Sequence, residues 1–446
     1  MKKLFIFLVL IPLISFAQCW QSVDAGANHT LAIKNDGTLW SWGSNNFYKL
    51  GYETPSGTNP NPNMVGNATN WQSVSAGEWH SAGIKSDGTL WVWGYNKYGQ
   101  GGQGTSGTEN AIIDVPTQIG SDNNWLSVSA GTNYTLAVKN DGTLWGTGNN
   151  EYGELGIGTS ISAVFMTQIG TDTNWNQVSA GGSDSLALKL DGTLWTWGTG
   201  YLGNGNEITT SNIPIQLGVE NDWLKISKET GSAIKINGTL WSWGFHSGNG
   251  TIEISTIPTQ IGSSANWKCI STGIGIKTDG TLWTWGLDEY GQLGDSTSIN
   301  NFLTSQVGND TDWESISDGG YYYYNVAIKT NSTLFSWGLN SSGELGNGTT
   351  IDSSIPTQVD CTKLKTIDFE NDSFTIFPNP AKDFINIKKS DNLLIDKITV
   401  IDIYGKTVII AENLYDKLNI QHLPNGIYLL QINCQNRKFN YKFIKE

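Results

Sequence analysis

The chain contains seven copies of one eight-residue motif, first seen as Asp36-Gly37-Thr38-Leu39-Trp40-Ser41-Trp42-Gly43. The other copies begin at Asp87, Asp141, Asp191, Asn237, Asp279 and Asn331, with start-to-start steps of 42 to 54 residues. Repeats of this length are typical of propellers and solenoids, in which each unit buries its apolar surface against its neighbours. The repeat therefore limits the fold before any single residue is assigned a role.

Each unit consists of four short segments that have the composition of β-strands. The first is Trp-x-x-Val/Ile-Ser, beginning in unit one at Trp20, and the second is an apolar stretch ending in lysine, such as Thr30–Lys34. The third is the motif itself, and the fourth resembles Pro116–Ile119. All are rich in β-branched or aromatic residues and are bounded by Gly, Asn or Asp. Four antiparallel strands in each of seven units predict an all-β fold, a seven-bladed β-propeller.

The motif also predicts local geometry. Asp36-Gly37 is expected to form a two-residue hairpin turn in which both positions adopt positive φ. Trp40 and Trp42 are two residues apart, so they are expected to share one face of the strand. Nineteen of the 20 tryptophans occupy repeat-equivalent positions, which assigns them to packing rather than to a ligand site. The exception, Trp79, lies in a loop.

The two ends of the predicted blades differ in variability. The Asp-Gly turns and the linkers between units are short and uniform, whereas the connections from the third to the fourth segment, such as 44–62 and 95–114, are long and variable. The connection from the first to the second segment is two residues shorter in unit five and four shorter in unit six. It is two residues longer in unit seven, where it carries Tyr321–Tyr324. Strand alternation places both variable connections at one end of the blade, which we expect to be the binding face.

Aromatic residues on these loops or at their borders are the predicted partner contacts. They are Phe47, Tyr48, Trp79, Tyr98, Tyr152, Tyr201, Phe245, Tyr290, Tyr321, Tyr322, Tyr323 and Tyr324. The copies followed by glycine can instead be residues that pack the loop.

No catalytic residue, cofactor or metal site is predicted. His29 and His80 share one repeat position, which Tyr134 fills in unit three, so a structural hydrogen-bonding role is expected. The sequence contains no nucleophile elbow, zinc-protease helix or phosphate-binding loop. Recurrent Asp-Gly pairs are explained by hairpin turns without calcium. A polysaccharide-active enzyme with paired acids in the central channel, or a lectin, stays open as the alternative.

Charge excludes one class of partner. Residues 20–360 hold 12 lysines, no arginine and 30 acidic residues, a net charge of −18. Seven of these lysines end the second segment of their unit and are therefore framework residues; they are Lys34, Lys85, Lys139, Lys189, Lys235, Lys277 and Lys329. Because nucleic-acid binding needs clustered cations to neutralise phosphates, the sequence argues against it.

The N-terminus predicts export. Lys2 and Lys3 precede an apolar run, Leu4–Leu13, and a small-residue cleavage site that ends at Ala17, so residues 1–17 are read as a signal peptide. Disulfides are permitted in exported proteins. When the chain ends are overlaid on the linker before Trp125, Cys19 and Cys361 fall about three positions apart, within reach of a disulfide that would close the ring. The alternative is two unpaired thiols.

The repeats resemble the regulator of chromosome condensation family, a seven-bladed propeller. The resemblance rests on the first-segment pattern, the eight-residue motif and the Asn-x-Tyr-Gly-Glu/Gln-Leu-Gly pattern of 150–156 and, closely, 288–294. It implies a propeller over residues 18–367. The family's namesake is a guanine-nucleotide exchange factor that binds chromatin, a role that the acidic, exported chain disfavours. A secreted bacterial member resembles a β-lactamase inhibitor that grips an enzyme with one propeller face.

The last 73 residues, 374–446, differ in composition, with 10 basic and 7 acidic residues and no tryptophan. They follow a linker at 368–373 and resemble the C-terminal sorting domain of type IX secretion in Bacteroidetes, an immunoglobulin-like β-sandwich. The matching residues are Phe377, Pro378, Asn379, Pro380, Asn425, Gly426 and Tyr428. The resemblance implies the type IX secretion machinery as a partner and a location at the cell surface or in the medium.

Together these patterns predict an exported, non-enzymatic binding protein. Its partner, a protein or a glycan, is expected on the variable loop face, and no segment of the mature chain is expected to span a membrane.

Overall fold

The computed structural model describes residues 19–54, 56–107, 111–227, 231–244, 248–319, 323–361, 374–389, 395–402, 406–412, 416–434 and 437–446. The chain divides into two compact units, residues 1–362 and 363–446. The expected signal peptide 1–17, the segment 364–367 and the linker 368–373 lie outside the described residues, as do Phe245, Tyr321 and Tyr322.

In the first unit, 28 strands of the described residues form seven four-stranded antiparallel sheets, the blades. Blade 1 consists of β1 (Trp20–Gly26), β2 (His29–Lys34), β3 (Leu39–Ser44) and β4 (Thr58–Met64), with a short 3-10 helix η1 (Asn46–Tyr48) before β4. Blade 2 consists of β5 (Trp71–Ala76), β6 (His80–Lys85), β7 (Leu90–Tyr95) and β8 (Ile112–Gln118). Blade 3 consists of β9 (Trp125–Ala130), β10 (Tyr134–Lys139), β11 (Leu144–Gly148) and β12 (Ala163–Gln168). Blade 4 consists of β13 (Trp175–Ala180), β14 (Asp184–Lys189), β15 (Leu194–Gly200) and β16 (Thr209–Gln216).

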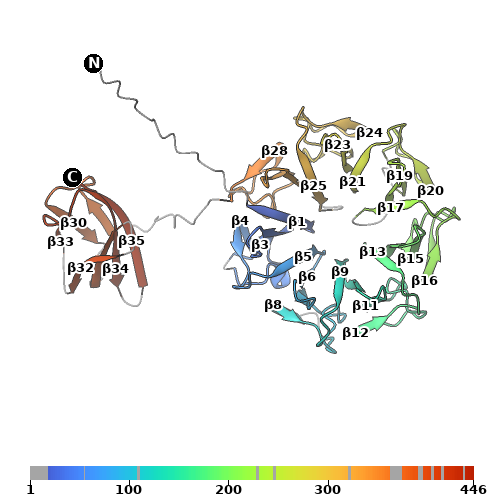
Figure 1. Cartoon of the computed structure of the whole chain (residues 1–446), viewed down its shortest axis with the longest axis horizontal. Coiled ribbons are helices and arrows are strands. Elements are labelled where there is room, and N and C mark those ends of the chain that lie inside the picture. The colour runs from blue at the N-terminus through green and yellow to red at the C-terminus, as the bar shows by residue number, and fades with distance from the viewer. Residues whose placement is uncertain are drawn as a thin grey trace, which may run out of the picture. The chain divides into compact units, whose positions relative to one another are not determined.

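Blade 5 consists of β17 (Trp223–Ile226), β18 (Ser232–Lys235), β19 (Leu240–Gly244) and β20 (Ser255–Gln260). Blade 6 consists of β21 (Trp267–Ser271), β22 (Ile274–Lys277), β23 (Leu282–Gly286) and β24 (Asn301–Gln306). Blade 7 consists of β25 (Trp313–Asp318), β26 (Tyr324–Lys329), β27 (Leu334–Gly338) and β28 (Ser353–Val359). The blades form a ring with the first strands at its centre and the fourth strands at its rim (Figure 1). The predicted all-β, four-stranded blade architecture is confirmed.

The fourth strands are the outer edges of the blade sheets, and their sequences suit that place. Loops of the preceding blades donate backbone hydrogen bonds to them, for example from the N–H of Gly104 to Val164 O (2.7 Å). Pro116, Pro214, Pro258 and Pro356 lie within β8, β16, β20 and β28. Proline lacks the N–H that a central strand must donate, and on an edge it also discourages pairing with a foreign strand.

The turn between the second and third strands differs from the expected geometry. Gly37 has φ 76°, but Asp36 is not among the residues with positive φ. The N–H of Gly37 donates to Lys34 O (2.9 Å), and the N–H of Lys34 donates to Thr38 O (3.0 Å). This is a three-residue loop with a glycine bulge, so the prediction of a two-residue turn with two positive φ angles is wrong.

The acidic residue of the turn has a different role, because it orders the strand that follows. Asp36 Oδ1 accepts hydrogen bonds from the N–H (3.0 Å) and the hydroxyl (2.6 Å) of Thr38. Thr38 Oγ1 in turn accepts from Trp40 Nε1 (2.8 Å). The same chain of bonds recurs at the turns beginning with Asp87, Asp141, Asp191, Asn237 and Asp279. The carboxylate or amide of the motif thus aims its first tryptophan.

The seven framework lysines each lie against two aromatic rings of their own blade. Lys34 Nζ is 5.1 Å from the ring centroid of Trp20 and 3.5 Å from that of Trp40. The other six ammonium groups lie 3.5 to 5.2 Å from their rings. Cation–π attraction therefore ties the first and third strands of each blade together.

Neighbouring blades are joined by the second tryptophan of the motif. Trp42 is fully buried and donates Nε1 to the carbonyl of Glu344 in blade 7 (2.8 Å). Trp93, Trp197 and Trp337 donate in the same way to the loop of the preceding blade. Apolar clusters likewise span blades; one contains Leu31 of blade 1 and Trp125 of blade 3. The core of the ring therefore lies between the blades, as the repeat positions of the tryptophans predict.

The ring closes between blades 7 and 1 without exchange of a strand. The N–H of Trp20 donates to Ser332 O (3.1 Å), which repeats the bond from Trp71 to Gly37 O within the ring (3.1 Å). A disulfide joins Cys19 to Cys361 with Cα atoms 6.1 Å apart. The expected ring-closing disulfide is therefore present.

The second unit contains two sheets. One holds β29 (Phe374–Phe377), β30 (Phe384–Lys389) and β33 (Lys417–Asn419); the other holds β32 (Thr407–Glu412), β31 (Ile395–Asp402), β34 (Gly426–Cys434) and β35 (Arg437–Lys445) in that order. Buried residues of both sheets, such as Ile385 and Leu430, share one core, so the expected β-sandwich is confirmed. Within the described parts of both units, no helix has the length and apolar character needed to cross a bilayer.

Removal of the disulfide should weaken the ring, because the bond closes a loop of very wide sequence separation in the unfolded chain. A Cys19→Ser/Cys361→Ser variant is expected to lose about 2–5 kcal/mol of stability, seen as a lower Tm by circular dichroism. Reducing agent should lower the Tm of the wild type and leave that of the double variant unchanged. Cys269 in β21 is a free cysteine, and a Cys269→Ala variant, which keeps the disulfide, should respond to reducing agent as the wild type does. Equal Tm values for the wild type with and without reducing agent would contradict a closing role.

Candidate functional site

At the loop end of most blades, a large side chain at or next to the start of the second strand contacts the next blade. The contacts are His29 Nε2 to Ser81 Oγ (2.9 Å), His80 Nε2 to Thr135 Oγ1 (2.9 Å), Tyr134 OH to Ser185 Oγ (3.0 Å) and Tyr324 OH to Thr30 Oγ1 (3.1 Å). Burial lowers the pKa of His80 to about 3, so its ring is neutral and acts as a hydrogen-bonding group. Both histidines are structural, as the sequence predicts.

Among the described residues, blades 4, 5 and 6 have no histidine or tyrosine at this position. Blade 4 has the shorter side chain of Asp184 at the position, while β18 and β22 have only four residues each, against six for the second strand of the other blades. A Cβ on Gly43 of blade 1 would lie 2.5 Å from the carbonyl oxygen of Asn28. A Cβ on Gly286 of blade 6 would meet nothing within 4 Å. The shortened connections therefore leave space that is filled elsewhere in the ring.

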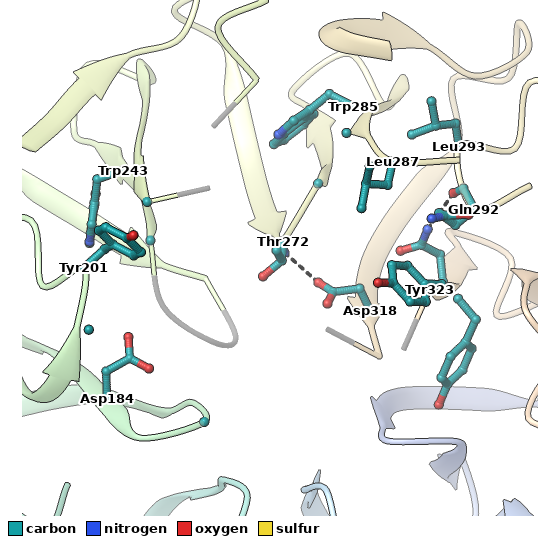
Figure 2. A pocket seen from close by; sticks show the side chains of 18 of the residues that line it. Asp184, Tyr201, Trp243, Thr272, Trp285, Leu287, Gln292, Leu293, Asp318 and Tyr323 are labelled. Atoms are coloured by element: carbon teal, nitrogen blue, oxygen red, sulfur yellow. Dashed lines mark hydrogen bonds between the residues drawn. The ribbon is translucent and has the colours of Figure 1, made fainter. Parts of the chain in front are cut away.

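That space is a cavity of ≈ 530 Å³ on the loop face. Figure 2 shows one wall with Asp184, Tyr201 and Trp243, the other wall with Trp285, Leu287, Gln292, Leu293 and Tyr323, and Thr272 and Asp318 between them. Six glycines also line the cavity, as do four further residues: Gly182, Gly200, Gly231, Gly244, Gly273 and Gly286, and Ser183, Thr199, Tyr324 and Asn325. Cavities of this size with aromatic walls and a few polar groups are typical ligand sites.

The polar groups of the cavity are acidic or neutral. Asp184 and Asp318 supply carboxylates, and Asp318 Oδ2 accepts a hydrogen bond from the N–H of Thr272 (2.6 Å; Figure 2). Among the described lining residues there is no lysine, arginine or histidine. Carboxylates only accept hydrogen bonds, so a group that meets either of them must donate.

Gln292 contributes a buried amide to the cavity. Its Oε1 accepts from the N–H of Tyr290 (2.9 Å), while its Nε2 has no hydrogen-bond partner among the described residues. The side chain is 7% exposed and lines the cavity. Because an unpaired buried donor is costly, this amide favours an acceptor on whatever fills the cavity.

The predicted aromatic contacts divide into groups. Tyr201 and Tyr323 are partly buried and line the cavity, and the ring of Tyr290 lies 5.4 Å from that of Tyr323. Tyr324 also borders the cavity but is 1% exposed, and its hydroxyl donates to His29 O (2.6 Å), so it is part of the frame. Tyr152 is 46% exposed on the loop of blade 3 and does not line the cavity.

The remaining candidates cluster on blades 1 and 2. The ring of Phe47 lies 5.8 Å from that of Trp79 and 4.5 Å from that of Tyr95, and Tyr95 lies 6.4 Å from Tyr98. Tyr48 has φ 61° at a position where units two, three, six and seven use glycine, for example Gly99. The structure thus separates the predicted residues into a cavity group and a blade 1–2 aromatic cluster.

Several cavity residues were missed by the sequence-based prediction. Trp243 and Trp285 were assigned to packing only, and Leu287, Gln292 and Leu293 fall in repeat patterns. The available signal was the pair of shortened connections in units five and six. The sequence-based prediction took variable loops to be positions where additional residues contact a partner. In the structure, the cavity forms where the connections of units five and six are shorter.

Blade 1 carries one further departure from the repeat. Lys49 replaces the Glu or Gln of the loop motif; it is fully buried, and its Nζ donates to the carbonyls of Ala27 and Glu78. Burial lowers the pKa of Lys49 to about 7 and raises that of Glu344, in blade 7, to about 7. Attraction between the two charges opposes both shifts. Blade 1 and blade 7 therefore each hold one buried titratable group in the loop between their third and fourth strands.

In the second unit, the predicted sorting-motif residues have structural contacts. Asn379 accepts at Oδ1 from the N–H of Ile444 (2.9 Å), and its Nδ2 donates to Lys442 O (3.1 Å), which fastens the segment 377–380 to β35. Tyr428 OH donates to Pro424 O (2.8 Å). Within the described residues, no cluster of three or more His, Cys, Asp or Glu side chains could hold a metal ion.

Comparison with protein-family models identifies both parts of the chain. The secretion system C-terminal sorting domain matches residues 375–446. Regulator of chromosome condensation (RCC1) repeat models match residues 20–48, 71–100 and 125–154, and 36–84, 87–138 and 331–368. The chain carries RCC1 repeats and a type IX sorting domain, and the sorting domain indicates export to the cell surface or the medium.

Curated relatives match over only part of their length. The ultraviolet-B receptor UVR8 of Arabidopsis thaliana is 31% identical over 140 residues, which are 31% of this chain and 31% of the receptor. The E3 ubiquitin-protein ligase HERC2 of Homo sapiens is 30% identical over 141 residues, 31% of this chain and 3% of the ligase. The matched stretches thus span less than a third of either relative.

Solved structures share the fold. Prp20p of Saccharomyces cerevisiae has a TM-score of 0.64 at 17% identity, covering 80% of this chain and 90% of Prp20p. Human WBSCR16 has a TM-score of 0.52 at 22% identity, covering 78% of this chain and 83% of WBSCR16. At these identities the likeness shows the propeller architecture and carries no function.

The pKa of Glu344 predicts a pH-dependent stability. Between about pH 4.5 and 7, folded Glu344 keeps a proton that the unfolded chain has released, so this group lowers stability as pH rises. Glu344→Gln, which matches the native Gln292 at the same repeat position, should remove that loss. Its stability relative to the wild type is expected to rise by about 1–3 kcal/mol from pH 4.5 to 7.5, measured by denaturant unfolding. Glu151→Gln, on an exposed loop side chain, is the control; parallel curves for Glu344→Gln and the wild type would refute the prediction.

Proposed function

We propose that this chain is an exported, non-enzymatic binding protein that holds a protein or glycan partner on the loop face of its propeller. The cavity between blades 4 and 7 carries the proposal. It lies where two blades lack the residues that fill the same space elsewhere, and its walls combine aromatic rings with a few polar groups. A rigid ring that presents a concave, variable surface is a common arrangement for binding.

The repeated tryptophans of the propeller support this proposal, because they pack the blades against one another and leave other side chains to contact a partner. Trp42 and its counterparts pack between blades, and their indole N–H groups donate to backbone carbonyls of the preceding blade. The cavity side chains Tyr201 and Tyr323, by contrast, are only partly buried. The blade 1–2 aromatic cluster is a second contact area on the proposed binding face.

Export completes the proposal. Residues 1–17 act as the signal peptide, residues 18–367 form the propeller, and residues 368–373 link it to the sorting domain, 374–446. The sorting domain engages the type IX secretion machinery. The mature propeller then meets its partner at the cell surface or in the medium.

A polysaccharide-active enzyme is the second candidate, because the cavity contains two carboxylates, Asp184 and Asp318. Paired carboxyl groups are the chemical requirement for most glycoside hydrolases. Binding is preferred because Asp318 already accepts a hydrogen bond from the backbone of Thr272. Prp20p binds Gsp1p and histones, but the ring of this chain holds no arginine and a net charge of −18, which disfavours a nucleic-acid or chromatin partner.

Filling the cavity should abolish partner capture. Leu287→Tyr adds volume to the cavity wall, and blade 2 natively holds Tyr95 at the same repeat position. Pull-down from culture medium together with a glycan array should show partners of the wild type that are reduced at least tenfold for this variant. Incubation with reporter glycosides in the same samples tests the enzymatic alternative.

Leu339→Tyr is the matched control, since Leu339 occupies the same repeat position in blade 7 and does not line the cavity. It should retain all partners. If both variants keep every partner, the proposed site is wrong; release of product from a reporter glycoside would favour the enzyme.

Deletion of residues 374–446 should block export in a bacterium that has type IX secretion. Immunoblots of cell and medium fractions are expected to show the truncated propeller inside the cell envelope and the full chain outside it. A milder variant, Asn379→Ala, removes the two bonds to β35 and should reduce export. Normal export of the truncated chain would contradict the assignment of the sorting domain.

A further inference from the structure

We propose that β8, the outer strand of blade 2, binds an extended segment of a partner protein as a fifth strand of that blade. The site is a sheet edge that the ring leaves open, and it lies at the rim of the propeller (Figure 1). Residues Ile112–Gln118 are all described, and none of them lines the cavity, so this surface is separate from the cavity of the proposed function.

In the other six blades, a loop of the preceding blade covers the outer edge. A backbone N–H of that loop donates to the carbonyl at one repeat position of the fourth strand. The bonds run from Gly104 to Val164 (2.7 Å), Gly158 to Asn212 (2.8 Å), Gly205 to Thr256 (2.8 Å), Gly250 to Phe302 (2.8 Å), Ser296 to Ser354 (2.9 Å) and Gly348 to Pro60 (2.9 Å). Each loop thus extends the sheet of the next blade by a short pairing.

A positive φ angle at the donor accompanies this pairing. The six donors have φ between 71° and 94°. Five of the six are glycine, which adopts such angles without a steric penalty. Blade 1 has Glu53 at this position, two residues after Gly51, and Glu53 is not among the residues with positive φ. Because a β-carbon makes that conformation costly, the loop of blade 1 takes another path.

The loop of blade 1 reaches blade 2 and then turns back to its own blade. A Cβ on Gly51 would lie 3.2 Å from Pro116 Cδ, so the loop contacts β8 at that point. The next residue, Tyr52, donates its hydroxyl to Ser41 O (2.9 Å). Asp114 stands at the position whose carbonyl accepts in the other blades. Among the described residues, no loop residue of blade 1 donates to that carbonyl.

The open edge has the composition of a pairing site. Val115 is 51% exposed and Ile112 is 39% exposed, and both are β-branched residues that favour strands. An exposed apolar edge strand presents unpaired backbone groups to an extended chain. Pro116 does not prevent pairing at this place. Blades 4, 5 and 7 have proline at the same position, and their edges are paired with a loop.

The six paired loops show which kind of segment fits such an edge. The donor is glycine or serine, and threonine follows it in five of the six loops, for example in Gly348-Thr349. When an extended peptide adds to a sheet, main-chain hydrogen bonds provide affinity and the side chains beside them provide specificity. The partner segment is therefore an extended stretch that contains a glycine.

Charge favours a segment of another protein over β8 of a second copy. The exposed carboxylates of Glu53 and Asp114 border the edge, and neither forms a hydrogen bond or an ion pair among the described residues, Lys97 of the blade 2 loop included. By sequence, residues 55 and 108–110, which lie outside the described ranges, add one acid and no lysine or arginine. Pairing of β8 with its copy would bring like charges together, whereas a lysine or arginine beside the glycine would be attracted.

The test is fluorescence anisotropy of the full-length protein with labelled peptides. The first probe has the sequence of residues 345–351, Leu-Gly-Asn-Gly-Thr-Thr-Ile, which covers the edge of blade 1 in the chain, followed by two lysines. A second probe carries Gly348→Pro and so lacks the donor N–H, and a third ends in two glutamates instead. The first probe is expected to bind at least about tenfold more tightly than the second, and more tightly than the third.

Substitutions in the protein then locate the site. Val115→Lys places a charge on the open edge and should weaken binding of the first probe about tenfold. Ile257→Lys is the matched control at the same repeat position of blade 5, where the loop of Gly205 covers the edge, and should leave the affinity within about twofold.

Glu53→Gly supplies the residue that the other loops use, so the loop of blade 1 should cover the edge itself and weaken binding. Glu53→Gln removes the same charge but keeps the β-carbon, so it should bind the probe more tightly than Glu53→Gly. Thermal unfolding of the variants separates loss of folding from loss of binding.

Three outcomes would overturn the inference. One is the absence of binding by the first probe, and another is binding that neither Val115→Lys nor Glu53→Gly weakens. The third is a dimer of the wild type, seen by analytical ultracentrifugation, that Val115→Lys disrupts, because a second copy would then occupy the edge. Leu287→Tyr in the cavity should bind the probe as the wild type does, so failure at the edge and failure of the proposed function are measured separately.

Discussion

Lateral contact between neighbouring blades is the interaction on which the whole ring depends. A four-stranded blade has two faces, and an isolated blade would leave its tryptophans in water. In the ring these tryptophans pack against neighbouring blades. The indole of Trp42, for example, is fully buried and donates a hydrogen bond to the backbone of blade 7. Each blade thus completes the core of the next, and the last blade must meet the first. Since no strand is exchanged at that seam, the Cys19–Cys361 disulfide and the backbone bonds of Trp20 hold it.

This dependence explains why the residues that pack the blades repeat so strictly. It also explains why a shorter connection within a blade has a large effect on the surface of the ring. A blade with a shortened connection between the first and second strands keeps its tryptophans buried. Trp243 and Trp285 accordingly remain 2% and 3% exposed. The space above them is not refilled, since the positions of the neighbouring blades are set by the rest of the ring. Two adjacent shortened blades therefore produce one cavity rather than a collapsed edge.

Departures from the repeat are concentrated in two places. One is the cavity, where Asp184, Gly231 and Gly273 stand at or near the position of His29 and its counterparts. The other is blade 1, where Lys49 and Tyr48 replace a neutral or acidic residue and a glycine of the loop motif. A buried lysine and a tyrosine with φ 61° both cost stability, so their presence on the loop face argues for a role beyond packing.

The sequence alone determined the number of blades, their strand order and the sandwich that follows, because all of these depend on local periodicity and on repetition. It also predicted the closing disulfide, with two unpaired thiols as the alternative, since the chain ends overlay on an internal linker; the structure shows the bond. The Asp36-Gly37 turn was misjudged, because Asp-Gly also suits a three-residue loop with a bulge. The cavity could be identified only from the tertiary structure. Asp184 and Asp318 are more than 130 residues apart in the chain, and only the curvature of the ring brings their blades to opposite sides of a space that two short connections leave open.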